Sequence, residues 1–324
     1  MTKITLLDSS LAYQLSSHVG EKIDGDPLWT ARFLVTNPNA ILAMHLDFLR
    51  AGCNIICTNT YQASVTGFIK YLNKTEEESI NLIKSAVKLA QRAIEIYKEE
   101  TKDTDVPNKN PLIAGACGPY GAAQHDGSEY TGLYGKSISP TILLDFHRIR
   151  IKALIDAGVD LLALETIPCR EEGDALVNLL KSEFPTIKAW LSFSCREDGN
   201  NIADGSNFQE TAIQCYNRSQ PNQILAIGVN CLLPKIVTSL FKGINSEARD
   251  FIPLIVYANS GEKYFPNEKK WKMVQDSLPS EYFVKEWIDL GVRYIGGCCR
   301  TNVTNLKKIA DEIQAWKDER EINV

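Results

Sequence analysis

Long apolar runs, an excess of basic charge and a leader-like start are all missing from this 324-residue sequence. No stretch approaches the roughly 18 consecutive apolar residues that mark a membrane-spanning helix. The segment from Met1 to Leu7 is too short, and turns polar too early, for a secretory signal peptide. The formal net charge is -5, whereas nucleic acids and anionic membranes attract basic surfaces. We therefore expect a cytoplasmic protein that binds neither membranes nor nucleic acid.

Histidine is also scarce, which bears on the kinds of metal site the chain can build. Hydrolytic zinc centres use mainly histidine and carboxylate ligands. The chain has only four histidines: His18, His45, His125 and His147. No two of them form a His-x-x-x-His pair. No Gly-x-Gly-x-x-Gly follows the first predicted strand, which argues against a dinucleotide-binding fold. The sequence thus disfavours both classes of site.

Cysteine is plentiful by contrast. The chain has nine, an odd number that cannot close completely into disulfides, and their spacing is not that of a small secreted scaffold. In a reducing compartment these thiols are free to act as metal ligands. Six of them we expect to be small buried fillers: Cys53, Cys57, Cys117, Cys169, Cys195 and Cys215.

Short β-rich runs alternate with amphipathic stretches along the whole chain, and 44% of the residues are hydrophobic, enough for a full core. The clearest helix spans 75–98, with Thr75 as N-cap before three glutamates. The eight predicted strands are Lys3–Leu7, Asn54–Thr58, Leu112–Ala116, Asp160–Leu164, Ile187–Phe193, Ile224–Val229, Leu254–Tyr257 and Arg293–Gly296. The other predicted helices are Pro140–Asp156, Glu171–Glu183, Asn207–Arg218, Pro234–Lys242, Glu281–Leu290 and Val303–Trp316.

Three predicted strands are preceded by a glycine that ends the helix before them, at Gly52, Gly158 and Gly291. This repeated helix-Gly-strand unit implies parallel strands with right-handed crossovers. About eight such units predict a (β/α)8 TIM barrel of the α/β class, and no linker divides the chain, so a single domain spans 1–324. Three segments are predicted to be loops: 101–110, 120–139 and 259–280. The last two follow strands and are candidate lids.

The unusual residues follow predicted strands, and in a parallel barrel those ends share one face. Asp8 ends the first strand, Thr58-Asn59-Thr60 the second, Glu165 the fourth and Asn230-Cys231 the sixth. Gly297-Cys298-Cys299 ends the eighth. We therefore expect these residues to form one site.

The adjacent Cys298 and Cys299 cannot easily bridge each other, because a vicinal disulfide is strained. The preceding Gly296-Gly297 permits a sharp turn that lets both thiols face one metal ion, and Cys231 supplies a third sulfur. Three sulfurs and an open fourth position are typical of catalytic zinc. A buried, inert cysteine pair is the competing interpretation.

The type of ligand limits the reaction. Three thiolates leave Zn²⁺ with a formal charge of -1, so the ion is a poor Lewis acid. It is suited to binding another thiol as thiolate while leaving it electron-rich enough to attack carbon. The expected chemistry is thiol alkylation.

Two elements carry a resemblance to the homocysteine S-methyltransferases: Gly-Val-Asn-Cys at 228–231 and Gly-Gly-Cys-Cys-Arg-Thr at 296–301. The segments at 118–122 and 126–132 look like the branch of that family that uses S-methylmethionine or S-adenosylmethionine. Further matches at 58–62, 165–168 and 257–262 extend the resemblance over nearly the whole chain.

The resemblance implies one zinc ion on Cys231, Cys298 and Cys299. It also implies that Asp8 and Glu165 hold the homocysteine ammonium, in keeping with the charge of that group. Thr60 and Asn230 are further substrate-shell residues in this family. The betaine-using branch normally has a longer chain with a C-terminal oligomerisation extension, whereas this chain stops soon after the helix containing Trp316, so we expect a sulfonium donor rather than betaine. For partners we expect small-molecule substrates and a monomer or weak homo-oligomer.

At the end of the first strand the chain differs from the pattern of this family. The family opens with Asp-Gly-Gly and a Thr-Glu pair, whereas this chain has Asp8-Ser9-Ser10 followed by Tyr13-Gln14. Side chains at Ser9 and Ser10 narrow the turn around the substrate carboxylate or add hydrogen bonds to it. Three alternatives therefore stay open: homocysteine methylation, methylation of a selenol such as selenocysteine, and a zinc-binding relative without activity.

The donor is expected to bind above the homocysteine sulfur, with its methyl group in line. A sulfonium is a cation, and aromatic faces and carboxylates attract cations. The candidate donor-binding residues all lie in the predicted lid: Tyr120, Glu129, Tyr130 and Tyr134.

Overall fold

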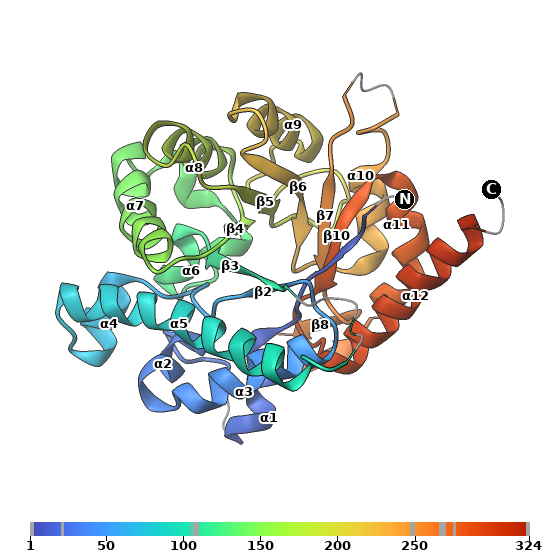
Figure 1. The fold of residues 1–324 in the computed structure, drawn as a ribbon. Coiled ribbons are helices and arrows are strands. Elements are labelled where there is room, and N and C mark those ends of the chain that lie inside the picture. Colours follow the sequence, from blue (N-terminus) through green and yellow to red (C-terminus); the bar gives the residue numbers. More distant parts are fainter. Residues whose placement is uncertain are drawn as a thin grey trace.

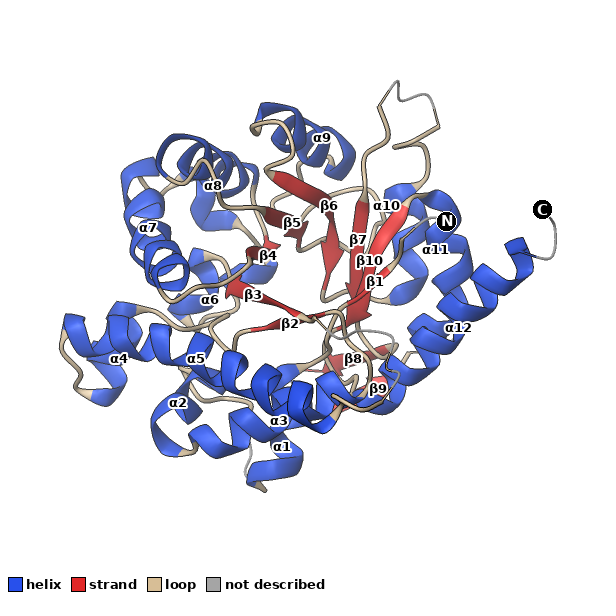
Figure 2. Ribbon diagram, viewed as in Figure 1, coloured by secondary structure: helices blue, strands red, loops and turns tan. Residues whose placement is uncertain are grey.

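The computed structural model describes residues 3–20, 23–104, 106, 110–246, 250–265, 270–274 and 277–321. Eight parallel strands stand at the centre and helices surround them, as Figures 1 and 2 show. The strands of the barrel are β1 (Thr5–Leu6), β2 (Ile55–Cys57), β3 (Leu112–Cys117), β4 (Leu161–Ile167), β5 (Ala189–Phe193), β6 (Ile224–Asn230), β7 (Leu254–Ala258) and β10 (Val292–Gly297).

The strand order β1-β10-β7-β6-β5-β4-β3-β2 makes a (β/α)8 barrel, as predicted. A parallel bridge between Leu7 and Ile55 joins β1 to β2, the first and last strands of that order. Asn54 supports the closure, because its side-chain oxygen accepts the Leu6 N–H and its own N–H donates to the Leu6 carbonyl. The ring of strands is thus joined by backbone contacts on both sides of β1.

The helices of the chain follow the expected alternation, and α7 begins and ends at the predicted residues. They are α1 (Leu11–Val19), α2 (Phe33–Thr36), α3 (Pro38–Arg50), α4 (Val65–Leu72), α5 (Glu76–Glu100), α6 (Tyr120–Gln124), α7 (Pro140–Asp156), α8 (Arg170–Glu183), α9 (Phe208–Arg218), α10 (Val237–Phe241), α11 (Val284–Leu290) and α12 (Val303–Glu321). Thr75 caps α5 in a capping box with Glu78, as the sequence indicated. Gly52, Gly158 and Gly291 are left-handed, in agreement with their predicted role at helix ends.

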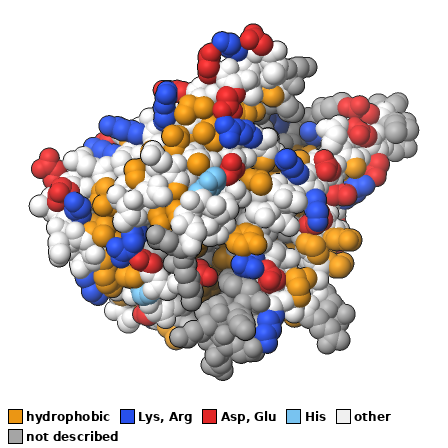
Figure 3. All heavy atoms as spheres, turned by 90° about the horizontal axis from the view of Figure 1, so that it is seen from below, with side chains coloured by type: hydrophobic (Ala, Val, Ile, Leu, Met, Phe, Trp, Pro, Cys, Tyr) orange, Lys and Arg blue, Asp and Glu red, His pale blue; other side chains and the backbone are white. Residues whose placement is uncertain are grey.

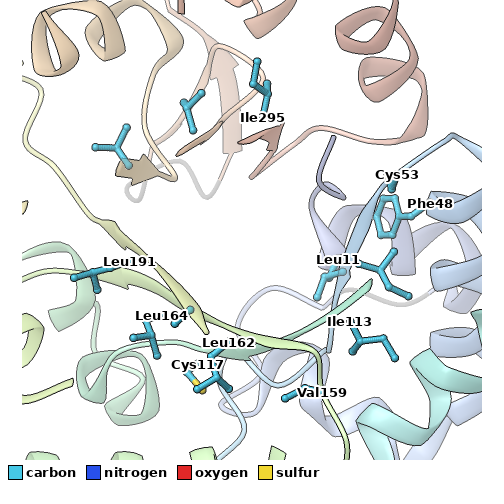
Figure 4. Packing of buried hydrophobic residues seen from close by; sticks show 14 of the residues in the cluster. Leu11, Phe48, Cys53, Ile113, Cys117, Val159, Leu162, Leu164, Leu191 and Ile295 are labelled. Carbon is cyan, nitrogen blue, oxygen red and sulfur yellow. The ribbon is translucent and has the colours of Figure 1, made fainter. Parts of the chain in front are cut away.

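Alternating strand residues separate two parts of the core. On β4, Leu162 and Leu164 point outward to the helices, with Leu191 of β5 and Cys117 of β3 (Figure 4). Leu161 and Ala163 point into the barrel and pack with inward residues of other strands, among them Trp190 and Tyr257. The same alternation turns Glu165 inward at the end of β4, where Thr166 is left-handed and the register with β5 shifts.

The 259–280 segment corrects the prediction of a plain loop, because it contains the antiparallel pair β8 (Glu262–Phe265) and β9 (Lys270–Met273). Each strand has four residues, too few for a clear alternation in the sequence. The 120–139 segment is likewise folded, with α6 and two short 3-10 helices at Ser128–Tyr130 and Leu133–Lys136.

The surface offers no single-sign field on the side seen in Figure 3, where basic, acidic and apolar side chains are interspersed. Within the described part of the chain, no helix combines the length and the apolar character that crossing a bilayer demands.

Candidate active site and metal centre

A cavity of about 310 Å³ opens at the carboxyl ends of the strands. Its walls include Asp8, Ser9, Glu165, Asn230 and all three cysteines predicted to bind metal. The residues that the sequence placed at separate strand ends therefore meet in one place, the usual position of a barrel active site.

The sulfurs of Cys231, Cys298 and Cys299 all lie within 4.8 Å of one another, and those of Cys231 and Cys299 are 3.4 Å apart. Zinc-sulfur bonds of about 2.3 Å in a tetrahedron place two sulfurs roughly 3.8 Å apart. The three thiols thus fit one zinc ion, with the fourth direction available to a ligand from the cavity.

Strand β7 holds two of these cysteines. The Cys231 N–H donates to the Tyr257 carbonyl at 3.1 Å, and the Cys298 N–H donates to the Ala258 carbonyl at 2.8 Å. Cys231 itself is left-handed, a conformation that costs a non-glycine residue about 1–3 kcal/mol and persists only where the surroundings impose it. Hydrogen bonds from the thiols of Cys298 and Cys299 hold the pKa of the Cys231 thiol well below its usual value.

The glycines before the cysteine pair act differently from the prediction. Neither Gly296 nor Gly297 has a positive φ, and the left-handed residue of the turn is Arg300. A Cβ on Gly296 would lie 2.7 Å from the Asp8 carbonyl oxygen, and one on Gly297 would lie 2.6 Å from the Ser9 hydroxyl. These glycines are therefore required because the end of β10 packs closely on the turn after β1.

Both serines of the Asp8-Ser9-Ser10 turn form hydrogen bonds within the protein. The Ser9 hydroxyl lies 2.5 Å from the Thr301 hydroxyl, which in turn donates to the Cys298 carbonyl at 2.5 Å. Ser10 caps α1 by accepting the Tyr13 N–H. Tyr13, in the place of the usual threonine, lies beneath the Arg300 guanidinium at 4.4 Å.

Asp8 and Glu165 are buried carboxyl groups. The Cys57 N–H donates to Asp8 at 2.5 Å, and burial raises the pKa of Asp8 to about 7. Burial also raises the pKa of Glu165 to about 8. No lysine or arginine is among the described residues that line the cavity, so these two groups face no cationic side chain there. Both are prepared to accept a cation from a ligand.

A chain of hydrogen-bonding groups runs inward from Glu165. The Tyr257 hydroxyl lies 3.0 Å from a Glu165 oxygen and 2.5 Å from the Ser192 hydroxyl, and Ser192 lies 2.9 Å from the Asn230 side-chain oxygen. Asn230 also accepts the Thr166 N–H at 2.9 Å. Asn230 therefore fixes the end of β4 beside Glu165, while Cys231 follows it directly.

Of the residues predicted to bind the donor, some line the cavity and others do not. Glu129 and Tyr130 line the cavity, and the Tyr130 hydroxyl lies 3.6 Å from the Cys231 sulfur. Tyr120 and Tyr134 are not among the lining residues: their rings pack together at 5.6 Å, and Tyr134 bonds to Glu172. Thr60 also lies outside the lining, buried beneath it, and donates to the Ala116 carbonyl. The structure thus places Tyr120, Tyr134 and Thr60 behind the residues that line the cavity.

Several lining residues were given no role in the prediction. Tyr61 and Tyr257 lie in the 58–62 and 257–262 matches, and Tyr257 belongs to a predicted strand end. Three lining residues before or at the start of the 3-10 helix Trp29–Arg32 carried no such signal: Asp24, Asp26 and Trp29. His125 lies in the 120–139 segment, which was predicted as a lid but without a role for this residue. The rings of Trp29 and Tyr61 meet edge to face at 5.8 Å. Among the residues that the structure describes, five carboxyl groups line the cavity.

The family described as homocysteine S-methyltransferase matches residues 5–313. A betaine-homocysteine S-methyltransferase of Drosophila melanogaster is 45% identical over 306 residues, covering 92% of this chain and 91% of that protein. A selenocysteine Se-methyltransferase of Brassica oleracea var. italica is 37% identical, covering 94% and 87%. The crystal structure of the homocysteine methyltransferase MmuM from Escherichia coli in its metallated form superposes with a TM-score of 0.80 at 35% identity, covering 95% and 96%.

Proposed function

The chain belongs to the homocysteine S-methyltransferase family and is a methyltransferase of that kind, and on this premise we propose that it is zinc-dependent and takes the methyl group from a small methyl sulfonium such as S-methylmethionine. The observation that carries the proposal is the cluster of three cysteine sulfurs within 4.8 Å, on a cavity that also holds Asp8 and Glu165.

Cys231, Cys298 and Cys299 would hold the zinc ion. When bound, zinc would lower the pKa of the homocysteine thiol so that it is present as a nucleophilic thiolate at neutral pH. The metallated state named for the Escherichia coli relative supports this assignment.

Asp8 and Glu165 would bind the homocysteine ammonium. Both are buried on the cavity wall, and burial raises the pKa of each. An ammonium placed between them returns both to the ionised form and is held by charge-assisted hydrogen bonds. This contact fixes the amino acid end while the sulfur faces the cysteines.

Trp29, Tyr61, Tyr130 and Glu129 would surround the donor cation. Glu129 has a buried carboxylate oxygen without a hydrogen-bond partner, and burial raises the pKa of this group. Aromatic faces and an unpaired carboxylate stabilise a sulfonium. Holding sulfur and methyl in line would supply much of the rate gain, since proximity contributes roughly 7–11 kcal/mol in well-oriented reactions.

The cavity favours a small donor with a net positive charge. Its 310 Å³ lies at the low end of ligand pockets, which favours S-methylmethionine over the larger S-adenosylmethionine. Betaine has no net charge, and its carboxylate would face a lining rich in carboxyl groups. The name of the Drosophila relative nevertheless makes betaine the second candidate, and the shared length of the two chains does not separate them.

Besides homocysteine, one other methyl acceptor is a candidate. The Brassica relative is named for selenocysteine, so a selenol is a second candidate for the position facing the cysteines. Equimolar homocysteine and selenocysteine in one reaction would rank the two acceptors directly by their methylated products.

The test is methyl transfer by the purified, zinc-analysed protein with methyl-labelled S-methylmethionine, S-adenosylmethionine and betaine in parallel. We expect one zinc per chain and the highest kcat/KM with S-methylmethionine. A higher value with betaine would replace the proposed donor. Bound zinc without transfer from any donor would favour the non-catalytic alternative.

A further inference from the structure

The segment between β3 and α7, residues 119–139, forms the part of the cavity wall that contains Glu129 and Tyr130. It is fixed at two points. The backbone N–H of Tyr120 near its start and the phenol of Tyr134 near its end both bond to one side chain, that of Glu172. The two cavity residues lie between these points.

Glu172 stands in the first turn of α8 and is fully buried. One carboxylate oxygen accepts the Tyr120 N–H at 2.6 Å and lies 2.8 Å from His147 Nε2, and the other accepts the Tyr134 hydroxyl at 2.5 Å. Burial lowers the pKa of His147, so the ring acts as a neutral donor. These contacts bond both carboxylate oxygens of Glu172 to α7 and to the 119–139 segment. None of these contacts is to a residue that lines the cavity.

Arg150, three residues after His147 on α7, anchors the neighbouring turn. Its buried guanidinium donates to the carbonyl oxygens of Gly118 at 2.9 Å and Tyr61 at 2.9 Å. The same helix therefore supports both Tyr61 and the start of the segment. Arg150 also supplies positive charge near the Glu172 carboxylate.

Close packing leaves the segment little freedom. A Cβ on Gly121 would lie 2.6 Å from the Tyr134 ring and 2.7 Å from the Glu129 nitrogen. A Cβ on Gly132 would lie 2.6 Å from the Pro168 carbonyl oxygen, just after β4. The position of Glu129 and Tyr130 thus depends on contacts that converge on the start of α8.

We propose that Glu172 is a positioning residue for the donor half of the site, holding both ends of the 119–139 segment so that Glu129 and Tyr130 face the cysteine sulfurs. The inference rests on the donor site proposed above. It sets donor recognition apart from zinc and homocysteine binding, because Glu172 bonds to Tyr120, Tyr134 and His147, none of which is a proposed acceptor residue.

The test is Glu172→Gln, with Tyr134→Phe removing only one of the two attachments and Glu183→Gln, on the exposed part of the same helix, as the control. We expect the donor KM to rise about tenfold in Glu172→Gln and less in Tyr134→Phe, with zinc content and homocysteine KM unchanged. An equal rise in both KM values, or loss of zinc, would overturn the proposal.

Amide hydrogen exchange gives a measurement that needs no activity. We expect faster exchange of the amides of 119–139 in Glu172→Gln, with unchanged exchange in β6, β7 and β10. Faster exchange across the whole chain would mean that Glu172 only stabilises the fold. If the wild-type protein transfers no methyl group while this local change appears, the proposed donor is wrong but the positioning role stands.

Discussion

The cavity has two walls of different construction. The strand-end wall consists of Asp8, Glu165, Cys231, Cys298 and Cys299, each at or just after a barrel strand. The loop wall consists of Trp29, Tyr61, Glu129 and Tyr130, supplied by turns and by the segment before α7. Backbone bonds to β7 fix Cys231 and Cys298 of the first wall. Side-chain contacts of Glu172 hold the segment that carries Glu129 and Tyr130 of the second.

The difference separates two tasks. A metal centre needs three sulfurs placed within tenths of an ångström, and strand ends supply such precision because the barrel register fixes them. Recognition of a donor cation tolerates looser geometry, and loops can change without disturbing the barrel. Relatives named for different donors and acceptors are compatible with this division.

The largest expected effect falls on the strand-end wall. Cys298→Ser removes one of three ligands, so we expect loss of bound zinc and a fall in kcat/KM of more than the roughly 10–100-fold typical of outer-shell changes. Zinc analysis and the labelled-methyl assay measure both. Cys195→Ser, a thiol outside the cavity, is the matched control; full zinc content in Cys298→Ser would contradict the ligand assignment.

Removing one carboxylate should weaken acceptor binding alone. Glu165→Gln loses a charge-assisted hydrogen bond to the ammonium, so we expect the homocysteine KM to rise about 10- to 100-fold with the donor KM unchanged. Steady-state kinetics with each substrate varied gives the two values. A rise confined to the donor KM would mean that the strand-end wall binds the donor rather than homocysteine.

Protonation provides a second test of the same wall. Without ligand, burial raises the pKa of Asp8 to about 7 and that of Glu165 to about 8, so at pH 7 Asp8 is about half protonated and Glu165 is mostly protonated. An ammonium favours the charged forms of both, so binding at pH 7 should release between one and two protons from this pair, and affinity should fall as pH drops through 8 and 7. Calorimetry in buffers of different ionisation enthalpy measures the release, which should shrink in Glu165→Gln.

On the loop wall the expected effects are smaller. Glu129→Gln keeps the size of the side chain and removes its charge, so we expect the donor KM to rise about fivefold while the homocysteine KM stays constant. The same kinetic assay detects it. An uncharged donor analogue should bind both forms equally; a preference for the wild type would assign Glu129 another role.

The smallest effect concerns the departure at the first strand end. Ser9→Gly removes the hydroxyl that bonds to Thr301, so we expect zinc affinity to fall about fivefold, measured by chelator competition. Ser10→Gly removes only the cap of α1 and should cost a few tenths of a kcal/mol in stability without changing zinc affinity. Equal zinc affinity in all three proteins would show that Ser9 does not support the cysteine turn.

The two walls also differ in how far the sequence could predict them. The barrel and the meeting of Asp8, Glu165 and the three cysteines followed from the alternation of strands and helices, because parallel strand ends must share a face. The bounds of α7, α8 and α9 were predicted to within one residue, whereas α1 and α4 were not predicted. Trp29 and Asp24 could not be found that way, since their position depends on how a loop folds back over the barrel. Tyr120 and Tyr134 were predicted to bind the donor from residue type alone, and packing places them behind the lining, where their rings meet and Tyr134 bonds to Glu172.

The oxygens from Glu165 to Asn230 can also be counted by their hydrogens. Three contacts link Glu165, Tyr257, Ser192 and Asn230, but the two hydroxyls own only two hydrogens between them. With Glu165 ionised, one contact has none to share. Tyr257 then donates to Glu165 and Ser192 donates to Asn230, so the contact between the two hydroxyls is the one without a hydrogen. With Glu165 neutral, its own hydrogen completes the row. Charging this carboxyl therefore leaves the row one hydrogen short, and occupation of the cavity would reach the Tyr257–Ser192 contact inside the barrel.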